Sequence, residues 1–299
     1  MDMRLGAFDL EGTLPELRAP HALATLRPWV DVGSVGRLTF RSLERHFQAR
    51  DLAKLARPGV FFDFTRYRPT IHTVDGQRQV TVPTVNVRYA RGDGEHDFVF
   101  LHLLEPHLNG EAFVHSIVNL LKRLDVRRYC LVGSMYDLVP HTKPIMVTGA
   151  ASGEDTLSRV RSLGVHSSSY EGPTSIASLV SQEVLKIGVE TMGLIAHLPQ
   201  YAQMDVDHCG RLRILELLCD LYDLDMDLDR VKLRAGQQQE ELKSAMERNP
   251  EVRSLVQQLE RQYDDRVSQL RQGHTEEISE LSPEVQDFLE QLGDQFSQN

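Results

Sequence analysis

The segment Phe98-Val99-Phe100-Leu101-His102-Leu103-Leu104 decides the fold class, because it is apolar at nearly every position and has the length of a strand. A strand without a polar face is typical of the centre of a sheet that is covered on both sides. Farther on, Phe113, Ile117, Leu120 and Leu124 recur at spacings of three and four, which predicts an amphipathic helix. Tyr129–Val132 follows as the next predicted strand. This strand–helix–strand order indicates an α/β protein.

The same alternation continues toward the C-terminus. We expect strands at Pro144–Val147 and Met192–Ala196, and helices that contain Leu157–Leu163, Pro173–Lys186 and Leu212–Tyr222. Strands and helices that alternate at this length predict a mostly parallel central sheet with helices on both faces.

On the N-terminal side of the central strand, we expect a strand at Ala22–Leu26, a helix from Val35 and a buried aromatic strand at Gly59–Phe64. The apolar period then changes to two on either side of Asp75-Gly76. That dipeptide is typical of a type I′ turn, so the segment predicts a β-hairpin. Pro83 within the second run of the hairpin indicates an edge strand or a bulge.

The composition changes near Val231, after which Gln, Glu, Arg and Ser dominate. Asn249-Pro250-Glu251 is typical of a helix start, with an Asn cap and Pro at the first position. Ser282-Pro283-Glu284 repeats this signal. Each start precedes one apolar stripe, formed by Val252, Val256, Leu259, Tyr263, Val267 and Leu270, and by Val285, Phe288, Leu289, Leu292 and Phe296. We therefore expect an N-terminal extension at 1–20, an α/β domain at 21–232 and a helical appendage at 233–299.

The chain has 299 residues and a formal charge of −10. This charge argues against a nucleic-acid partner, since phosphate binding needs a concentrated basic face. The N-terminal residues lack the pattern of a signal peptide, and no apolar run reaches the roughly 18 residues of a membrane span. We therefore expect a cytoplasmic protein without a membrane partner. The cysteines Cys130, Cys209 and Cys219 have no zinc spacing, and we expect buried thiols.

Four segments of the α/β region together resemble the proteasome-assembly-chaperone-two family, in particular its bacterial branch. They are Trp29-Val30-Asp31-Val32-Gly33, Leu104-Glu105-Pro106 followed by Phe113, Pro140-His141-Thr142-Lys143-Pro144, and Gly172-Pro173-Thr174-Ser175-Ile176. The resemblance covers roughly residues 20–230. It implies a phosphorylase/hydrolase-like α/β fold and homo-oligomers, with a trimer as the expected state. For the eukaryotic and archaeal members it implies a chaperone role in proteasome assembly.

Two positions depart from the family pattern. Gly110 stands where an aromatic residue is expected, and the sequence ends Ser297-Gln298-Asn299 instead of hydrophobic–tyrosine–any residue. The second departure weakens the expectation of a proteasome partner.

The polar residues of these motifs are the candidate ligand or interface residues. Glu105, His107, His141 and Lys143 fall at predicted strand ends, where ligands bind in open α/β sheets. The backbone amides of Thr174 and Ser175 open a helix and offer a weak anion site. The alternative is that the prolines of these loops fix tight turns while the polar side chains satisfy the backbone. We expect no metal and no cofactor, because the histidines lack metal-site spacing and no phosphate-binding loop is present.

Two functions follow from these observations. The first is a non-enzymatic, assembly-chaperone-like interaction protein that forms homo-oligomers and has itself, or another protein complex, as partner. The second is a small-ligand binder or a ligase-like enzyme that uses a cleft at Glu105, His107, His141 and Lys143. Relatives have been labelled ATP-grasp carboxylate–amine ligases, but the glycine-rich loop and the paired magnesium carboxylates of that chemistry are missing from the sequence. The first function is therefore favoured.

Overall fold

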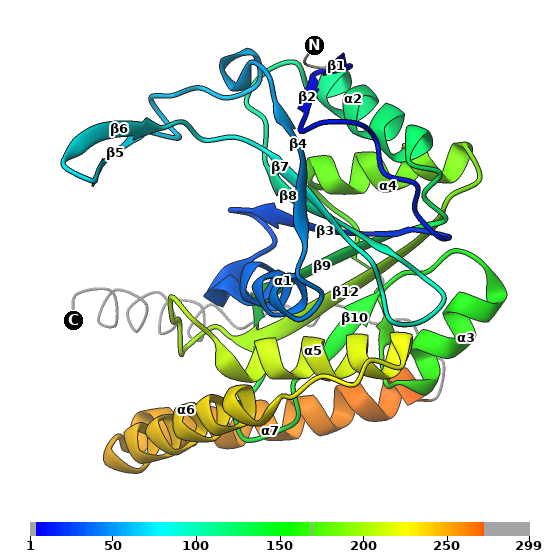
Figure 1. The fold of residues 1–299 in the computed structure, drawn as a ribbon. Helices are drawn as coiled ribbons and strands as arrows, with labels where there is room; N and C mark the ends of the chain where they lie inside the picture. Colours follow the sequence, from blue (N-terminus) through cyan, green and yellow to red (C-terminus); the bar gives the residue numbers. More distant parts are fainter. Residues whose placement is uncertain (1–3, 169, 272–299) are drawn as a thin grey trace. The chain divides into compact units, whose positions relative to one another are not determined.

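The structure, a computed structural model, describes residues 4–168 and 170–271 (Figure 1). The chain divides into two compact units. The first unit comprises Met1–Trp29, Phe40–Leu131 and Pro173–Met192, and the second comprises Val30–Thr39, Val132–Gly172 and Gly193–Asn299. Both units are mixed α/β structures.

The first unit contains a sheet of strand order β1-β2-β4-β7-β8-β3-β9. Its strands are β1 (Arg4–Leu5), β2 (Phe8–Leu10), β3 (His21–Arg27), β4 (Arg50–Leu55), β7 (Asn86–Ala90), β8 (Phe98–Leu104) and the first half of β9 (Arg128–Asp137). Its helices are α2 (Gly110–Arg123), α4 (Ile176–Lys186) and most of α1 (Val35–His46). Figure 1 shows α2 and α4 side by side.

Strand β8 lies inside this sheet, as its apolar sequence predicts. It pairs in parallel with β3 and antiparallel with β7. Every residue of β8 except His102 is buried. The ring of Phe40 in α1 packs edge-on against Phe100 and His102, at centroid distances of 5.6 and 5.4 Å. Burial of the apolar side chains on both faces is the main stabilising contribution of this strand.

The sheet is mixed, although the alternation in the sequence predicted a mostly parallel one. Parallel pairing joins β3 to β8 and to β9, whereas the pairs β1·β2, β2·β4, β4·β7 and β7·β8 are antiparallel. The physical reason lies in the connections. Parallel neighbours need a crossover of a dozen or more residues, whereas the short segment between β7 and β8 brings the chain straight back.

The prediction of a strand at Gly59–Phe64 is wrong. The segment forms the 3₁₀ turn η2 (Pro58–Val60) followed by turns. Phe61 and Phe62 are nevertheless buried, because their rings pack edge-on against Phe113 of α2 at 5.3 and 6.2 Å. An apolar run signals burial, and here the burial belongs to a loop.

The hairpin predicted around Asp75-Gly76 is confirmed. Strands β5 (Thr70–Val74) and β6 (Gln77–Thr81) form a separate two-stranded sheet. Asp75 and Gly76 have φ angles of 49° and 77°, as a type I′ turn requires at both central positions. The second strand ends before Pro83, and the chain then continues into β7.

The second unit contains the second half of β9, most of β12 (Glu190–Pro199), and the strands β10 (Val147–Gly149) and β11 (His166–Ser167). Strand β10 pairs antiparallel with β12 and in parallel with β11. The strand predicted at Pro144–Val147 therefore begins only at the last of these residues. The helices of this unit are α3 (Glu154–Ser162), α5 (His208–Tyr222), α6 (Asp229–Arg248) and α7 (Pro250–Arg271).

Helix α7 begins where the sequence predicts a helix start. The side-chain oxygen of Asn249 accepts the backbone N–H groups of Glu251 and Val252 at 3.0 and 3.4 Å. Val252, Leu255, Val256 and Leu259 of α7 form a buried cluster with Tyr201. The second predicted helix start, at Ser282-Pro283-Glu284, lies outside the described residues. Within the described ranges, every helix is too short or too polar to cross a membrane.

Candidate functional site

The motif at Trp29–Gly33 shapes the backbone around α1. One carboxylate oxygen of Asp31 accepts the N–H groups of Gly36 and Arg37 at 2.6 and 3.2 Å, so Asp31 caps α1. Gly33 has a φ of 58°, and a Cβ added there would lie 2.7 Å from the Cβ of Asp207. Only glycine permits this approach, and the carbonyl of Gly33 accepts the N–H of Asp207 at 2.8 Å. The conformation of this segment therefore explains Asp31 and Gly33 without a ligand.

Glu105 performs a similar role at α4 in the first unit. The motif residue Ser175 occupies the N-cap position in an extended conformation, yet its side chain makes no capping hydrogen bond. Instead, the carboxylate of Glu105 accepts the N–H of Ile176, with oxygen distances of 3.0 and 3.3 Å. Thr174 is exposed next to this site. The structure thus brings Glu105, Thr174 and Ser175 together at the N-terminus of α4. The carboxylate of Glu105 already compensates the positive end of the helix dipole there.

His107 lies close to Glu105 and stabilises the loop that follows η2. Its Nδ1 accepts the N–H of Asp63 at 3.2 Å, and its ring packs against Tyr67 at a centroid distance of 4.5 Å. The hydroxyl of Tyr67 donates to the carbonyl oxygen of Glu105 at 3.1 Å. His107 therefore links two loops of the first unit.

The Pro140–Pro144 motif contacts helix α7 in the second unit. Lys143 Nζ donates to both carboxylate oxygens of Asp264 at 2.9 and 2.8 Å, and Thr142 donates to Glu260 at 2.6 Å. The hydroxyl of Tyr263 donates to the carbonyl of Pro144 at 2.9 Å. The hydrogen bond from Lys143 to Asp264 is the main reason that the pKa of Lys143 is raised. The polar groups of this motif hold a helix of the same chain.

His141 is buried at the centre of the same motif. Its backbone N–H donates to the hydroxyl oxygen of Tyr201 at 2.8 Å, and its Nδ1 lies 2.7 Å from that oxygen. Burial lowers the pKa of His141, so the ring is neutral at physiological pH. The candidate residues of the second unit, His141 and Lys143, are therefore both engaged in fixing the loop.

A buried polar chain in the second unit was not foreseen from the sequence. Thr148 Oγ1 lies 2.7 Å from His197 Nε2, and His197 Nδ1 lies 2.6 Å from Asp137. Arg266 of α7 donates to the same Asp137 oxygen at 2.6 Å. The order of these groups is that of a nucleophile–histidine–aspartate triad. Thr148 and His197 are each only 4% exposed, however, so a substrate has no path to the Thr148 hydroxyl. This row of hydrogen-bonded groups is therefore structural.

Exposed apolar side chains mark the surface of the first unit. Trp29 is 71% exposed where β3 ends, and Val60, Phe64 and Leu108 are exposed in adjoining loops. Asn109 donates to the carbonyl of Val60 at 2.8 Å, which brings the loop that contains Leu108 next to the loop that contains Val60. Exposed apolar side chains of this size are candidate contacts for another protein.

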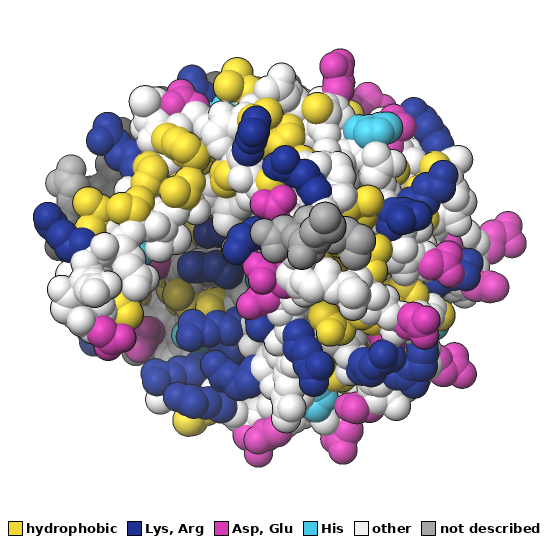
Figure 2. Space-filling view, turned by 45° about the horizontal axis from the view of Figure 1, so that its top comes forward, with side chains coloured by type: hydrophobic (Ala, Val, Ile, Leu, Met, Phe, Trp, Pro, Cys, Tyr) yellow, Lys and Arg dark blue, Asp and Glu magenta, His cyan; other side chains and the backbone are white. Residues whose placement is uncertain are grey.

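The β5–β6 hairpin is the most exposed regular element of the first unit, since each of its strand residues is exposed. Ile71 and Val80 are cross-strand partners, and they are 59% and 62% exposed. Figure 2 shows hydrophobic side chains at the left of the view, the side on which this hairpin lies in Figure 1. An isolated two-stranded hairpin is at best marginally stable in water, so this one needs a surface to pack against.

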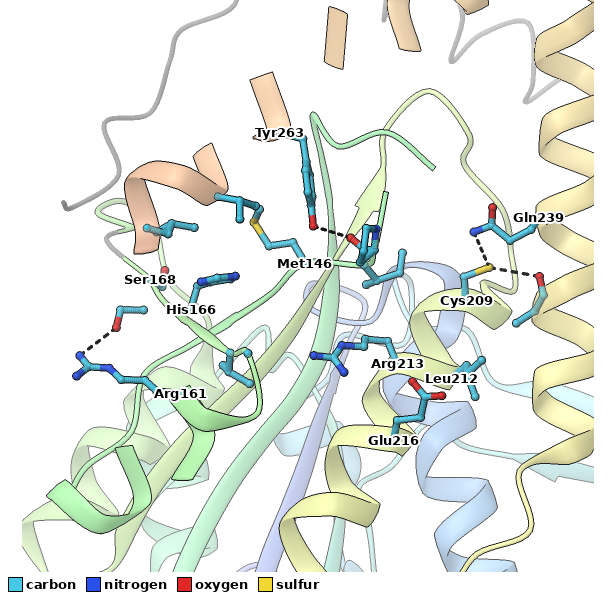
Figure 3. Close-up of a pocket in the computed structure, with 18 of the residues that line it drawn as sticks. Met146, Arg161, His166, Ser168, Cys209, Leu212, Arg213, Glu216, Gln239 and Tyr263 are labelled. Atoms are coloured by element: carbon cyan, nitrogen blue, oxygen red, sulfur yellow. Dashed lines mark hydrogen bonds between the residues drawn. The ribbon is translucent and has the colours of Figure 1, made fainter. Parts of the chain in front are cut away.

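A groove of about 1280 Å³ opens in the second unit between α5, α6, α7 and the loop around β11 (Figure 3). Arg161, His166, Arg213, Lys232 and Glu216 supply its charged and titratable groups, and Met146, Leu212, Val267 and Leu270 supply apolar surface. Within the described ranges, no group of His, Cys, Asp and Glu side chains is arranged to hold a metal ion. Cys209 also lines the groove, and burial raises the pKa of its thiol to about 11.

The chain matches a protein-family model. The model of the PAC2 family matches residues 25–246. The chain belongs to the PAC2 family. The matched region contains the motif segments, the strands from β4 onward and helices α1 to α5, and it extends almost to the end of α6, whereas β1, β2 and the start of β3 precede it. No curated protein matches the chain.

Solved structures of PAC2 proteins and similar chains share the fold. A PAC2 family protein from Streptomyces avermitilis is 26% identical with a TM-score of 0.71, and the match covers 79% of this chain and 99% of that one. A protein of unknown function from Mycobacterium tuberculosis is 24% identical with a TM-score of 0.76, covering 89% and 91% of the two chains. A proteasome-assembly chaperone homologue from the same species is 22% identical with a TM-score of 0.70, covering 79% and 99%.

Proposed function

We propose that this PAC2 protein is a non-enzymatic, assembly-chaperone-like interaction protein of the bacterial branch that forms homotrimers in the cytoplasm. The observation that carries the proposal is the β5–β6 hairpin, whose strand residues are all exposed. In a single copy, Ile71 and Val80 leave apolar surface in water. Packing on a second copy removes that surface and stabilises the hairpin, at about 25 cal/mol for each Å² buried.

The relatives support a role in protein assembly. The solved neighbour from M. tuberculosis is described as a proteasome-assembly chaperone homologue. We carry over from it the general role, which is that an oligomer of this chain holds another protein complex during its assembly. The exposed side chains of Trp29, Val60, Phe64 and Leu108 offer an apolar contact surface for such a partner. The phosphorylase/hydrolase-like architecture serves as a scaffold in this proposal.

The ligand-binding alternative has less support. Glu105 is bonded to Ile176, His107 to Asp63, His141 to Tyr201 and Lys143 to Asp264. Each of these contacts is made within one unit and engages a polar atom of the side chain, although the buried Nε2 of His141 has no hydrogen-bond partner among the described residues. Binding a ligand there requires the chain to give up stabilising contacts first.

The mass of the full chain in solution tests the proposal. Side chains alternate between the faces of a strand, so Ile71 and Val80 share one face of the hairpin, and His72 and Gln79 share the other. We expect the double variant Ile71→Asp, Val80→Asp to have the mass of a monomer by size exclusion with light scattering. The matched variant His72→Asp, Gln79→Asp should keep the mass of a trimer. A monomeric wild-type chain, or a trimer that survives the first variant, would show the proposal to be wrong.

A further inference from the structure

Strand β8 is apolar except at His102, and this residue belongs to a polar row that crosses four neighbouring strands of the first unit (Figure 1). Residues that lie directly opposite each other in a sheet point to the same face. The register places three polar residues in line with His102, namely Thr25 of β3, Asn86 of β7 and Lys54 of β4. The adjacent row, on the other face of the sheet, is apolar and buried at Ala24, Leu101, Val87 and Ala53. One face of these strands therefore serves the core, and the other carries polar groups.

A cavity of about 470 Å³ opens on this polar row, within the range of roughly 300–1,000 Å³ that is typical of small-molecule pockets. Helix α1 packs on the row through Phe40, which lies against His102, whereas Asn86 and Lys54 are exposed. The cavity is lined by Arg27, Lys54, Asn86, Arg88 and His102, all in the first unit. Arg27 is the last residue of β3, which pairs in parallel with β8. The cavity therefore lies toward the carboxyl ends of two parallel strands, where α/β sheets bind ligands.

The chain itself engages the cations of this cavity to different degrees. Arg88 is held on two sides, because it donates to Asp51 at 2.8 Å and forms an ion pair with Glu44 at 3.2 Å. Lys54 forms an ion pair with Glu11 at 2.9 Å, but the two side chains are 57% and 48% exposed. Exposed ion pairs of this kind contribute little to stability, so Lys54 can turn from Glu11 to a bound anion at small cost.

Glu44 determines which nitrogen of His102 is left for a ligand. Nε2 of His102 lies 2.6 Å from one carboxylate oxygen of Glu44, which is only 9% exposed. A carboxylate accepts hydrogen bonds, so Nε2 carries a proton and Nδ1 remains for another partner. Nδ1 accepts a hydrogen bond in the neutral ring and donates one in the charged ring. His102 can therefore bond either protonation state of an oxyanion without giving up Glu44.

Thr25, the neighbour of His102 in the polar row, has a hydroxyl that the chain leaves without a partner. Its Oγ1 has no hydrogen-bond partner among the described residues, although Thr25 is only 1% exposed. Buried hydroxyl groups are nearly always hydrogen-bonded in native proteins. The polar row therefore has hydrogen-bonding capacity that contacts within the chain do not use.

The lining of the cavity fits a phosphate group better than a carboxylate. Arg27, Lys54, Asn86 and His102 come from four different strands, so polar groups reach the cavity from several directions. A phosphate group has three or four oxygens in a tetrahedral arrangement and can accept from all of these directions, whereas a carboxylate has two oxygens in one plane. Arginine and lysine are the side chains that proteins use most for phosphate. The two cations supply the charge that a phosphate dianion needs.

We propose that this cavity binds a phosphate group, with positive charge from Arg27 and Lys54 and hydrogen bonds from Asn86 and His102. The group belongs to inorganic phosphate or to a small phosphate ester. A water molecule takes about 30 Å³ of the liquid, so the cavity has room for an organic group beside the phosphate. This site contains none of the motif residues, and it depends neither on the trimer nor on the β5–β6 hairpin.

Isothermal titration calorimetry of the full chain at neutral pH tests the proposal, with inorganic phosphate, glycerol 3-phosphate and acetate as separate ligands. We expect both phosphate compounds to bind at one site per chain and acetate not to bind. Tighter binding of glycerol 3-phosphate assigns the site to a phosphate ester, and equal or weaker binding assigns it to free phosphate. Absence of binding by both phosphate compounds at millimolar concentration would overturn the proposal. Acetate that binds as tightly as phosphate would also overturn it, because the cavity would then respond to negative charge alone.

Matched variants locate the binding in this cavity. Arg27→Gln should weaken phosphate binding by at least about tenfold, since hydrogen bonds between charged groups are among the strong ones. Lys54→Gln should weaken it as well, and because the Lys54 side chain is 57% exposed, this variant keeps the fold and the test even if Arg27→Gln does not. Arg50→Gln removes an exposed cation of β4 that does not line the cavity and should leave the affinity unchanged. Wild-type affinity in both Arg27→Gln and Lys54→Gln would overturn the proposal.

Discussion

The carboxylate of Glu105 accepts the backbone N–H of Ile176 at 3.0 Å and joins the end of β8 to the first turn of α4 across 71 residues of sequence. The bond completes a helix terminus at which Ser175 makes no side-chain cap. Two of the motifs that carry the family resemblance therefore meet through a single hydrogen bond. Their shared role in this structure is to fix the position of α4 within the first unit.

Substituting Glu105 tests this capping role. Loss of a side-chain cap costs about 1 kcal/mol, so Glu105→Ala should lower the free energy of unfolding by about that amount. Glu105→Gln keeps an oxygen acceptor for the Ile176 N–H and should retain most of the stability at neutral pH. Urea unfolding of both variants measures the difference. Equal stability of Glu105→Ala and wild type would show that the bond contributes nothing.

The same residue predicts a pH dependence. Burial raises the pKa of Glu105 above its ordinary value, against the opposing effect of the Ile176 hydrogen bond. The folded state therefore holds the proton more tightly than the unfolded state, whose pKa is about 4.3. The contribution of Glu105 to stability is then fully present below that value and declines as the pH rises through the folded pKa. Glu105→Gln should remove this decline.

The central part of the fold could be predicted from local patterns. The apolar run of β8, the Asp75-Gly76 turn and the Asn249-Pro250 helix start each depend on neighbouring residues, which a sequence displays directly. The aromatic run at Gly59–Phe64 misled the prediction because its burial comes from a distant partner, Phe113 of α2. Local hydrophobicity records that a side chain is buried but not which structure buries it.

The contacts of the candidate site depend on tertiary structure and were less predictable. The sequence identified Glu105, His141 and Lys143 as unusual polar residues at element ends. Their partners Ile176, Tyr201 and Asp264 lie 71, 60 and 121 residues away. His197 and Asp137 are 60 residues apart on two strands, with no local spacing to suggest that they meet. Only the pairing of the strands brings such groups together.

Helix α7 should depend on the buried part of its apolar stripe. Leu259 is 1% exposed, and removing a buried leucine side chain typically costs 2–5 kcal/mol, roughly in proportion to the cavity left behind. Leu233 on α6 is 63% exposed, so the same substitution there should change stability by less than about 0.5 kcal/mol. Thermal unfolding of Leu259→Ala and Leu233→Ala makes the comparison. Similar melting temperatures for the two variants would contradict the packing described for α7.

The C-terminal part of α7 is held by the hydrogen bond from Arg266 to Asp137, and we expect this contact to weaken in acid. Burial by itself would raise the pKa of Asp137, but hydrogen bonds and charge interactions with His197 and Arg266 hold it well below its usual range. The stabilisation is therefore present above the ordinary aspartate pKa of about 3.9 and is lost as the pH falls below it. The protection factors of the amides at Tyr263–Leu270, which are exchange rates corrected for the intrinsic effect of pH, should therefore fall over this acidic window. In Asp137→Asn that pH dependence should disappear.

Removing the Arg266 side chain isolates the contribution of the helix to this contact. A hydrogen bond to a charged group contributes about 1.5–3 kcal/mol, so Arg266→Ala should speed exchange at Tyr263–Leu270 by at least tenfold at neutral pH. Arg261 is exposed on the same helix, and Arg261→Ala should leave the exchange rates unchanged. Because Lys143 and Asp264 form a more exposed pair, Lys143→Ala should have a smaller effect than Arg266→Ala. If Lys143→Ala loosened the helix more than Arg266→Ala, the exposed pair would be the main anchor of α7, and the role given to Asp137 would be wrong.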